Sequence, residues 1–303
     1  MKLISPLGHV DVVIPTPLAV TRTIGPWTVG NVLGRGGHGK VFMGTSTKNE
    51  VVALKVMDVA AGDAAFVSEV QVNAVLTQLA DKEDDGGRIL RQKEVICCED
   101  ELVSVHVPVV PWTLADLVGG WSSGRCIPHT LMGVKFIHDR GWMHHDLKPT
   151  NVGVRGEPPR AVLLDVGTSG FLEDDDGSME PEPGCGGTVT YFAPERELQP
   201  YNHSVDIWVM GIIGYEVTYG HHPFKFLLNP WRKGEEHEKL RPVFEKKYQE
   251  AIERLAADCK GARESPTAGY IHLGSFLAKM LRYPWAQANC EPRIAIDEKA
   301  RHD

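Results

Sequence analysis

The pattern of apolar and polar residues changes character at Trp27. Residues 1–26 carry four prolines and no regular period, which is typical of an extended arm. Three runs rich in apolar and β-branched residues follow at Trp27–Leu33, Lys40–Thr45 and Val51–Met57, with short turns between them. These runs predict three antiparallel strands behind an N-terminal extension.

A helix and two more strands are expected after this meander. Apolar residues recur at helical spacing over Phe66–Leu79. Ile89–Cys97 and Leu102–Val110 again have the composition of strands. Residues 27–110 are therefore expected to form a small β-rich unit with one main helix.

The rest of the chain has a helical pattern. Periodicity indicates helices at Leu114–Val118, His129–Asp139, Ser204–Tyr219 and Glu238–Ala257. The third segment is apolar along its length, and the fourth carries its apolar residues on one face. Residues 111–303 are therefore expected to be mainly helical, and a ligand is expected between this part and the β-rich unit.

Composition and charge narrow the class of protein. Hydrophobic residues make up 42% of the chain and charged residues 24%, which indicates a globular protein. Against 40 Asp and Glu there are 32 Lys and Arg, a net charge of −8, so no overall basic field attracts nucleic acid or anionic lipid. The six cysteines lack metal or disulfide spacing, and residues 1–26 contain no signal-peptide or membrane-spanning run. We therefore expect a cytoplasmic or nuclear protein with neither nucleic acid nor membrane among its partners.

A glycine-rich motif lies between the first two predicted strands. The motif is Gly34-Arg35-Gly36-Gly37-His38-Gly39-Lys40-Val41, of the form G-x-G-x-x-G-x-V. Because it joins two strands, it differs from a dinucleotide-binding fingerprint, which leads into a helix. Glycines let main-chain N–H groups approach anionic oxygens, so the motif could cover the phosphates of a nucleotide. By itself it also fits an ordinary turn.

A lysine lies inside the third predicted strand, after Val52-Ala53-Leu54. An unpaired ammonium at such a position is costly, so Lys55 needs a partner. Glu69 on the predicted helix is the obvious carboxylate, and the pair could hold the lysine against nucleotide phosphates. An ordinary ion pair between strand and helix is the alternative interpretation.

The most specific motif is His144-His145-Asp146-Leu147-Lys148-Pro149-Thr150-Asn151. Asp146 can orient a hydroxyl proton, Lys148 can neutralise charge on a transferring phosphoryl group, and Asn151 can hold a metal ion. Further along, Asp165 ends an apolar run and offers the kind of oxygen ligand that Mg²⁺ prefers. A polar loop without chemistry is the alternative.

Together with Gly187–Glu195 and Asp206–Gly211, these motifs resemble those of the eukaryotic protein kinase family over nearly the whole chain beyond the extension. The resemblance implies one bilobal α+β domain at residues 27–300. Its small antiparallel β-rich N-lobe, with one main helix, would span residues 27–110, and its larger helical C-lobe residues 111–303. It also implies an ATP-dependent, Mg²⁺-requiring enzyme that transfers the γ-phosphoryl group to Ser or Thr hydroxyls of protein substrates.

The resemblance further implies a role for each motif residue. For the nucleotide, Gly34, Gly36 and Gly39 would cover the phosphates, Val41 and Ala53 would contact adenine, and Lys55 would pair with Glu69. For the reaction, Asp146 would be the catalytic base beside Lys148, and Asn151 and Asp165 would bind Mg²⁺. For the surrounding structure, Thr188 would hydrogen-bond to Asp146 and Lys148, Asp206 would brace the loop that carries Asp146, and Glu195 would pair with Arg293. On these roles, changing Lys55, Asp146 or Asp165 should reduce phosphotransfer by orders of magnitude with little loss of stability.

The sequence departs from the family at several of these places. His145 stands where an arginine is usual, Val166 where a phenylalanine is usual, and Asn73 at a normally apolar position, so a loosely held active arrangement is expected. Gly153 replaces a bulky residue under the adenine, and the space it leaves predicts that Gly153→Leu tightens ATP binding. A pseudokinase that binds nucleotide or a partner without transferring phosphate is therefore the alternative function. A kinase-like enzyme acting on small molecules is a third.

The segment Thr168–Gly187 is acidic and contains no Lys or Arg. A phosphate added there would be repelled, and it would meet no arginine at position 145. We therefore expect activity to be largely independent of phosphorylation of this segment. A solvated loop without regulatory meaning is the alternative.

Overall fold

The structure is a computed structural model that describes most of the chain between residues 22 and 263. The described residues are 4–5, 8–9, 22–36, 39–58, 64–83, 85–118, 126–172, 179, 186–197, 200–226, 230, 234–263 and 277–281. The elements, in chain order, are β1 (Ile4–Ser5), β2 (Gly8–His9), β3 (Thr23–Ile24), β4 (Trp27–Gly36), β5 (Gly39–Ser46), β6 (Val51–Asp58), α1 (Ala64–Lys82), β7 (Arg91–Cys97), β8 (Glu101–Val107), β9 (Trp112–Thr113), η1 (Leu114–Leu117), α2 (Cys126–His138), β10 (Trp142–Met143), η3 (Pro149–Asn151), β11 (Val152–Arg155), β12 (Arg160–Leu163), η4 (Val166–Thr168), β13 (Gly170–Phe171), η5 (Val189–Tyr191), α3 (Ser204–Tyr219), α4 (Glu235–Glu238) and α5 (Arg241–Arg263).

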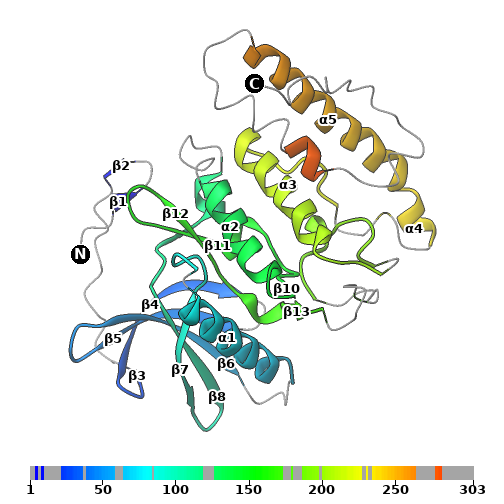
Figure 1. The fold of residues 1–303 in the computed structure, drawn as a ribbon. Helices are drawn as coiled ribbons and strands as arrows, with labels where there is room; N and C mark the ends of the chain where they lie inside the picture. The colour runs from blue at the N-terminus through cyan, green and yellow to red at the C-terminus, as the bar shows by residue number, and fades with distance from the viewer. Residues whose placement is uncertain are drawn as a thin grey trace.

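The N-lobe is a sheet of six antiparallel strands in the order β3-β4-β5-β6-β8-β7, with α1 beside it (Figure 1). Side chains alternate between the two faces of each strand. On one face, buried Leu54 and Val105 pack in a cluster with Trp27. The other face carries Lys55, which bonds to Glu69 on α1. The strand period of two therefore turns the lysine away from the apolar cluster and toward the helix.

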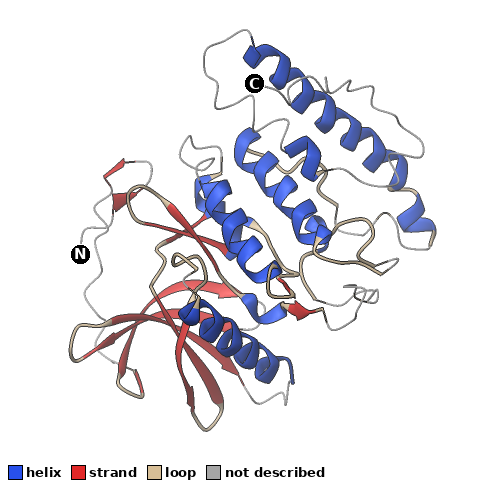
Figure 2. Cartoon of the chain, in the orientation of Figure 1, coloured by secondary structure: helices blue, strands red, loops and turns tan. Residues whose placement is uncertain are grey.

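The C-lobe gathers helices α2, α3 and α5 (Figure 2). Most residues of α3 are buried, among them Trp208, Ile212 and Ile213, because the segment is apolar around its whole circumference. Phe244 and Ile252 of α5 belong to the same hydrophobic cluster. Within the described residues, no helix combines the length and apolar character needed to cross a membrane.

One hydrophobic core continues from the C-lobe into α1. Buried Leu76 of α1 belongs to the same cluster as Leu163 and Val166 of the C-lobe. Ile89 forms a β-bridge with Leu163, and Leu90 N–H donates to the Leu163 carbonyl at 3.1 Å. The two lobes are therefore joined beside the strand that leads into Asp165.

A small sheet in the order β12-β11-β9 positions the two candidate metal ligands. Asn151 leads into β11 and Asp165 follows β12. These strands form a hairpin in which Val152 pairs with Leu163, and Leu164 N–H donates to the Asn151 carbonyl at 2.9 Å. The hairpin therefore brings the two side chains to one end of the sheet although they lie on different loops.

The bilobal α+β fold predicted from the sequence is confirmed, with changed element boundaries. The helix at Ser204–Tyr219 has the predicted bounds. The strand expected at Leu102–Val110 ends at Val107, since Pro108 has no N–H to donate to a ladder. The segment expected as a helix at Leu114–Val118 is a single 3-10 turn, η1. The last predicted helix begins later than expected, at Arg241, and continues to Arg263.

Candidate active site

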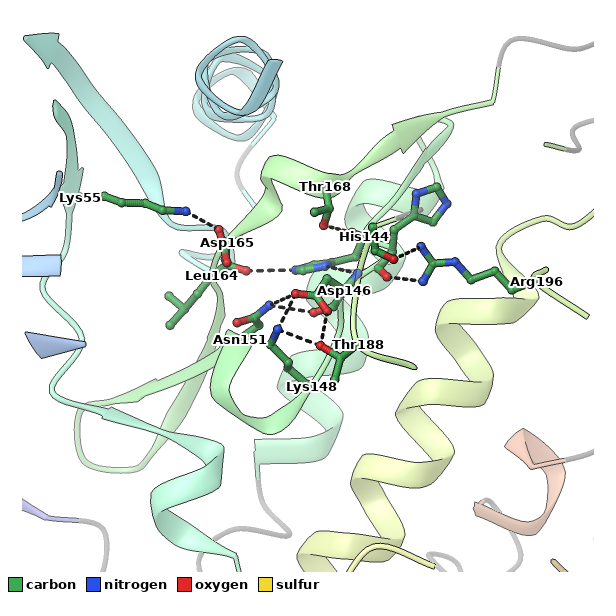
Figure 3. Close-up of polar contacts among 12 residues, drawn as sticks. Lys55, His144, Asp146, Lys148, Asn151, Leu164, Asp165, Thr168, Thr188 and Arg196 are labelled. Atoms are coloured by element: carbon green, nitrogen blue, oxygen red, sulfur yellow. Dashed lines mark hydrogen bonds and ion pairs between the residues drawn. The ribbon is translucent and has the colours of Figure 1, made fainter. Parts of the chain in front are cut away.

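The polar residues singled out by the motifs come from separate elements and meet at one place (Figure 3). Asp146 and Lys148 lie on the loop between β10 and η3, and Asn151 ends η3. Thr188 immediately precedes η5. Asp165 follows β12 at the other side of the group.

Asp146 has both carboxylate oxygens engaged. Its Oδ2 accepts hydrogen bonds from Lys148 Nζ at 2.6 Å and from Asn151 Nδ2 at 3.1 Å. Its Oδ1 accepts from Thr188 Oγ1 at 2.8 Å, and Lys148 Nζ also donates to Thr188 Oγ1 at 3.0 Å. The Asp146 cluster, as we call these four residues, fixes the carboxylate in one orientation.

Asp206, in the first turn of α3, holds the loop that carries Asp146. Its Oδ2 accepts from the N–H of His144 at 2.7 Å and lies 2.8 Å from Nε2 of His138, and its Oδ1 accepts from the N–H of His145 at 3.2 Å. Burial acts to raise the pKa of Asp206, but the hydrogen bond with His138 and the contacts with His144 lower it to about 2. A buried carboxylate with several donors remains ionised, so it fixes the backbone just before Asp146.

Lys55 lies between two carboxylates. Its Nζ donates to Glu69 Oε1 at 2.5 Å and to Asp165 Oδ1 at 2.6 Å. Burial acts to lower the pKa of Lys55, but the charges of Asp165 and Glu69 raise it above its ordinary value. Burial likewise acts to raise the pKa of Asp165, and the ammonium of Lys55 lowers it. Lys55 and Asp165 are therefore both charged near pH 7.

Two residues beside the cluster adopt left-handed backbone conformations that are uncommon outside glycine. The φ angles are 66° at His145 and 52° at Asp165. Each such conformation costs on the order of 1–3 kcal/mol and persists only where neighbouring contacts impose it. At His145, the backbone N–H donates to Asp206 Oδ1. Next to Asp165, His144 Nε2 lies 3.0 Å from the carbonyl oxygen of Leu164. The two turns aim the carboxylates of Asp146 and Asp165.

The family model described as protein kinase domain matches residues 27–283 of the chain. The chain belongs to the protein kinase family. The chain is 32% identical to the serine/threonine-protein kinase Nek5 of Mus musculus over 184 residues, which are 59% of the chain and 25% of Nek5. It is 30% identical to the calcium/calmodulin-dependent protein kinase type 1 of Caenorhabditis elegans over 223 residues, which are 69% of the chain and 60% of that relative. With Aurora kinase C of Mus musculus it shares 25% identity over 283 residues, 88% of the chain and 93% of the relative.

The share of each relative that the chain spans differs widely. It spans about a quarter of Nek5, as the 25% coverage states, and nearly all of Aurora kinase C, at 93%. What it has in common with all three is therefore the kinase domain.

The described residues of the glycine-rich motif lie at the end of β4 and the start of β5. Gly36 pairs with Gly39 at the end of this hairpin, and Gly34 pairs with Val41. Val41 also pairs with Lys55 on β6, so both share one face of the sheet, and Ala53 lies on that same face two residues before Lys55. The residues expected to contact adenine are thus brought to the face that holds the lysine.

Gly153 does not leave the spare space expected from the sequence. A Cβ atom placed on Gly153 would lie 2.6 Å from Val110 Cγ1 and 3.1 Å from Leu164 Cδ2. The side chains of Val110 and Leu164 already occupy the position. The space expected under the adenine is therefore absent, and the reason for expecting Gly153→Leu to tighten ATP binding is lost. The sequence around Gly153 does not reveal where the segment before Pro111 places Val110.

Gly153→Ala is instead expected to weaken ATP binding and to lower the free energy of unfolding by about 1–3 kcal/mol, the usual cost of overpacking. Calorimetric titration with ATP and urea unfolding measure the two effects. Gly34→Ala is the matched control for stability, because no atom lies within 4 Å of a Cβ placed there. Tighter ATP binding by Gly153→Ala would contradict the packing described here.

The substitutions at Val166 and Asn73 do not open the arrangement in this structure. Val166 is buried in the core cluster that joins the lobes. Asn73 is buried and donates Nδ2 to the Glu69 carbonyl at 2.8 Å, one helical turn back along α1. The contacts of Lys55 with Glu69 and Asp165 are formed beside both residues. The contacts that were expected to be loosely held are thus formed in this structure, and how firmly they are held stays a prediction.

The side chain of His145 is largely enclosed by neighbouring residues, which leaves little of it open to the activation segment, the chain between Asp165 and Glu195. Its ring meets Tyr201 edge-on, with centroids 5.7 Å apart. Burial first, and then the positive charge of Arg196, lower the pKa of His145 to about 4. The imidazole is therefore neutral near pH 7.

Acid is expected to destabilise the domain between about pH 6.5 and pH 4, partly through His145. An unfolded imidazole binds its proton below about pH 6.5, whereas the enclosed ring stays neutral until about pH 4. The unfolded state therefore binds more protons in this window, and stability is lost as pH falls. His145→Gln should reduce the slope of unfolding free energy against pH by up to about 1.4 kcal/mol per pH unit.

Urea unfolding at a series of pH values checks this slope. The change of the exposed residue His221 to Gln is the control, and His106 and His222, whose pKa values burial lowers to about 4, keep part of the slope in both variants. An identical slope in His145→Gln and wild type would contradict the assignment.

The predicted pair of Glu195 with Arg293 involves a residue outside the described part of the chain, Arg293. Glu195 accepts a long hydrogen bond from Ser204 Oγ at 3.5 Å, and burial raises the pKa of its carboxyl. The acidic residues between positions 173 and 182 also lie outside the described part of the chain.

Three polar residues of the site were not predicted from the sequence. They are His138, which bonds to Asp206, Thr168, whose Oγ1 donates to the His144 carbonyl at 3.2 Å, and Arg196, which donates to the His145 carbonyl. None of them stands in a motif with fixed spacing. A polar side chain at the end of an apolar helix was the available signal for His138.

The donor atoms at the site fit a magnesium ion. Asn151 donates hydrogen bonds from Nδ2 to Asp146, so its Oδ1 is left to bind a cation. Asp165 is ionised, and its side chain is about one third exposed, at 36%. One carboxylate and one amide oxygen are typical of Mg²⁺ sites that substrate phosphates and water complete.

Proposed function

We propose that this chain is an ATP-dependent Ser/Thr protein kinase that uses Mg²⁺. The observation that carries the proposal is the Asp146 cluster, in which Lys148 and Thr188 fix a buried carboxylate. Beside it lies an ammonium, Lys55, that is held by a carboxylate on α1 and by Asp165. A fixed proton acceptor next to fixed charges is what phosphoryl transfer requires of a protein.

Each residue of the chain has a distinct task in this proposal. Asp146 orients the substrate hydroxyl and receives its proton, while Lys148 neutralises negative charge on the group in transfer. Lys55 holds the phosphates of ATP, and Glu69 keeps the lysine in place. When bound at Asn151 and Asp165, Mg²⁺ would offset charge on the phosphate oxygens.

Ser and Thr of proteins are the proposed acceptors. The relatives named as serine/threonine-protein kinases support this choice, as does the resemblance of Lys148 and Thr188 to the Ser/Thr-specific branch of the family. A location in the cytoplasm or nucleus, and the absence of nucleic acid and membrane among the partners, remain predictions from composition.

The test is transfer of labelled γ-phosphate from ATP to a degenerate peptide library with Ser, Thr or Tyr as the acceptor. We expect labelled Ser and Thr peptides with the wild-type chain and Mg²⁺, and none with Asp165→Ala. ATP binding without any labelled peptide would favour the pseudokinase. Labelling of small hydroxylated metabolites but not of peptides would favour the third function.

A further inference from the structure

Arg196 directs its side chain at the catalytic loop (Figure 3). Nη1 donates to the His145 carbonyl at 2.6 Å, and Nη2 donates to the Gly186 carbonyl at 3.1 Å. The guanidinium carbon lies 4.2 Å from the centre of the Phe192 ring. Arg196 is only 7% exposed, so these are contacts of a buried cation.

None of the partners that the described residues offer this cation carries a negative charge. Among the described residues they are two neutral carbonyl groups and the face of one ring. Among these described contacts no carboxylate offsets the cost of burying the charge, so they do not form a stabilising ion pair. A guanidinium can nevertheless donate in two directions from one rigid plane, which a lysine ammonium on a flexible stem does less well.

The two carbonyls belong to the backbone segments that hold the catalytic carboxylate. His145 directly precedes Asp146, and Gly186 lies two residues before Thr188. Thr188 Oγ1 in turn donates to Asp146 Oδ1 at 2.8 Å. The guanidinium and the Thr188 hydroxyl therefore join the same two segments at two neighbouring points.

Gly187 shows independently how closely these segments approach. Its φ angle is 89°, and a Cβ atom placed there would lie 2.8 Å from the His145 carbonyl oxygen and 3.0 Å from Arg196 Nη1. Only glycine leaves room for the guanidinium between the two chains. The absence of a side chain at Gly187 therefore allows Arg196 to reach the His145 carbonyl.

We propose that Arg196 is a positioning residue that locks the activation segment to the catalytic loop and so sets the Asp146–Thr188 geometry without a phosphate group. This inference rests on the proposed kinase function. A guanidinium is permanently charged and needs no modification to bridge the two segments. His145, by contrast, is a neutral ring and offers a phosphate no cation, because burial and Arg196 lower its pKa to about 4.

The test compares Arg196→Ala, Arg196→Lys and wild type after phosphatase treatment of all three proteins. In Arg196→Ala we expect kcat for peptide phosphorylation to fall by about tenfold to a hundredfold, the usual effect of small displacements of catalytic groups. The KM for ATP should stay within about twofold, since Lys55 and Asp165 are not touched, and Arg196→Lys should be intermediate. Millimolar guanidinium, below denaturing concentrations, should restore much of the lost kcat in Arg196→Ala and none in Lys55→Met.

Two outcomes of these assays would overturn the proposal. One is a kcat of Arg196→Ala within about threefold of wild type, which is too small a change for a lost positioning contact. The other is a parallel loss of kcat, ATP binding and thermal stability that guanidinium does not rescue, which would make Arg196 an ordinary structural residue.

Amide hydrogen exchange separates this proposal from the proposed function. Arg196→Ala should exchange faster at residues 144–148 and 186–190 than wild type, with guanidinium reversing the change and β6 and β8 unaffected. This readout needs no catalysis. If the wild-type chain transfers no phosphate, the proposed kinase function fails. Faster exchange in Arg196→Ala would still support the positioning role of Arg196, and unchanged exchange would refute that role.

Discussion

Lys55→Met is expected to lower kcat for phosphotransfer by about a hundredfold to a thousandfold, the usual loss when one fixed charge or donor is removed from a reacting group. The methionine keeps the apolar stem of Lys55 but cannot reach phosphate oxygens as a cation. It also leaves Asp165 without the ammonium that lies 2.6 Å from its Oδ1. Steady-state phosphorylation of a peptide selected from the library measures the loss.

The same change is also expected to destabilise the fold, unlike the small effect expected from the sequence. The side chain of Glu69 is only 6% exposed, and Lys55 is its ion-pair partner. Removing one member of a buried pair usually costs about 3–5 kcal/mol, because the other charge is left uncompensated.

A double variant separates these two effects. Lys55→Met with Glu69→Gln should recover much of the stability and none of the rate. Lys93→Met is the surface control, since Lys93 pairs with Glu50 near the solvent and should change little. A double variant with a restored rate would contradict the role proposed for Lys55.

Asp146→Asn is expected to reduce kcat by about 10²–10⁴-fold, the usual contribution of a positioned acid or base. Asparagine has nearly the same shape, so Thr188 can still donate to its Oδ1. It cannot accept a proton, however, and its NH₂ group would face the ammonium of Lys148, which lies 2.6 Å from Asp146 Oδ2. ATP binding should be preserved, because the contacts of Lys55 are unchanged.

Asp139→Asn provides the matched control for this change. Asp139 is an exposed carboxylate after α2 that pairs with Lys135, outside the Asp146 cluster. Its rate should equal that of wild type. A rate for Asp146→Asn within about tenfold of wild type would exclude Asp146 as the proton acceptor.

Periodicity is enough to predict the elements that are long or strongly patterned. The α3 segment is mostly apolar over about four turns, so its bounds at Ser204 and Tyr219 follow from the sequence. The strands β10, β11 and β13 have two to four residues each, too few for a period to show. They form because tertiary packing places their backbones side by side.

For the site, the sequence identifies the motif residues but not the paths of the backbone between them. The contacts of Asp146 with Lys148 and Asn151 are local and fall within one motif. Those of Arg196 depend on the left-handed turn at His145 and on how the activation segment returns to the loop. The spacing of motif residues contains no information on such paths. The expectation of space beside Gly153 was wrong for the same reason.

One measurement tests the proposed kinase activity most directly. Phosphatase-treated wild type and Asp165→Ala are incubated with ATP, Mg²⁺ and a Ser peptide, and ADP and phosphopeptide are quantified in the same reaction. We predict equal amounts of ADP and phosphopeptide from wild type, and neither above background from Asp165→Ala. Phosphopeptide formed at the same rate by both proteins, or ATP bound by wild type without any phosphopeptide, would contradict the proposed activity.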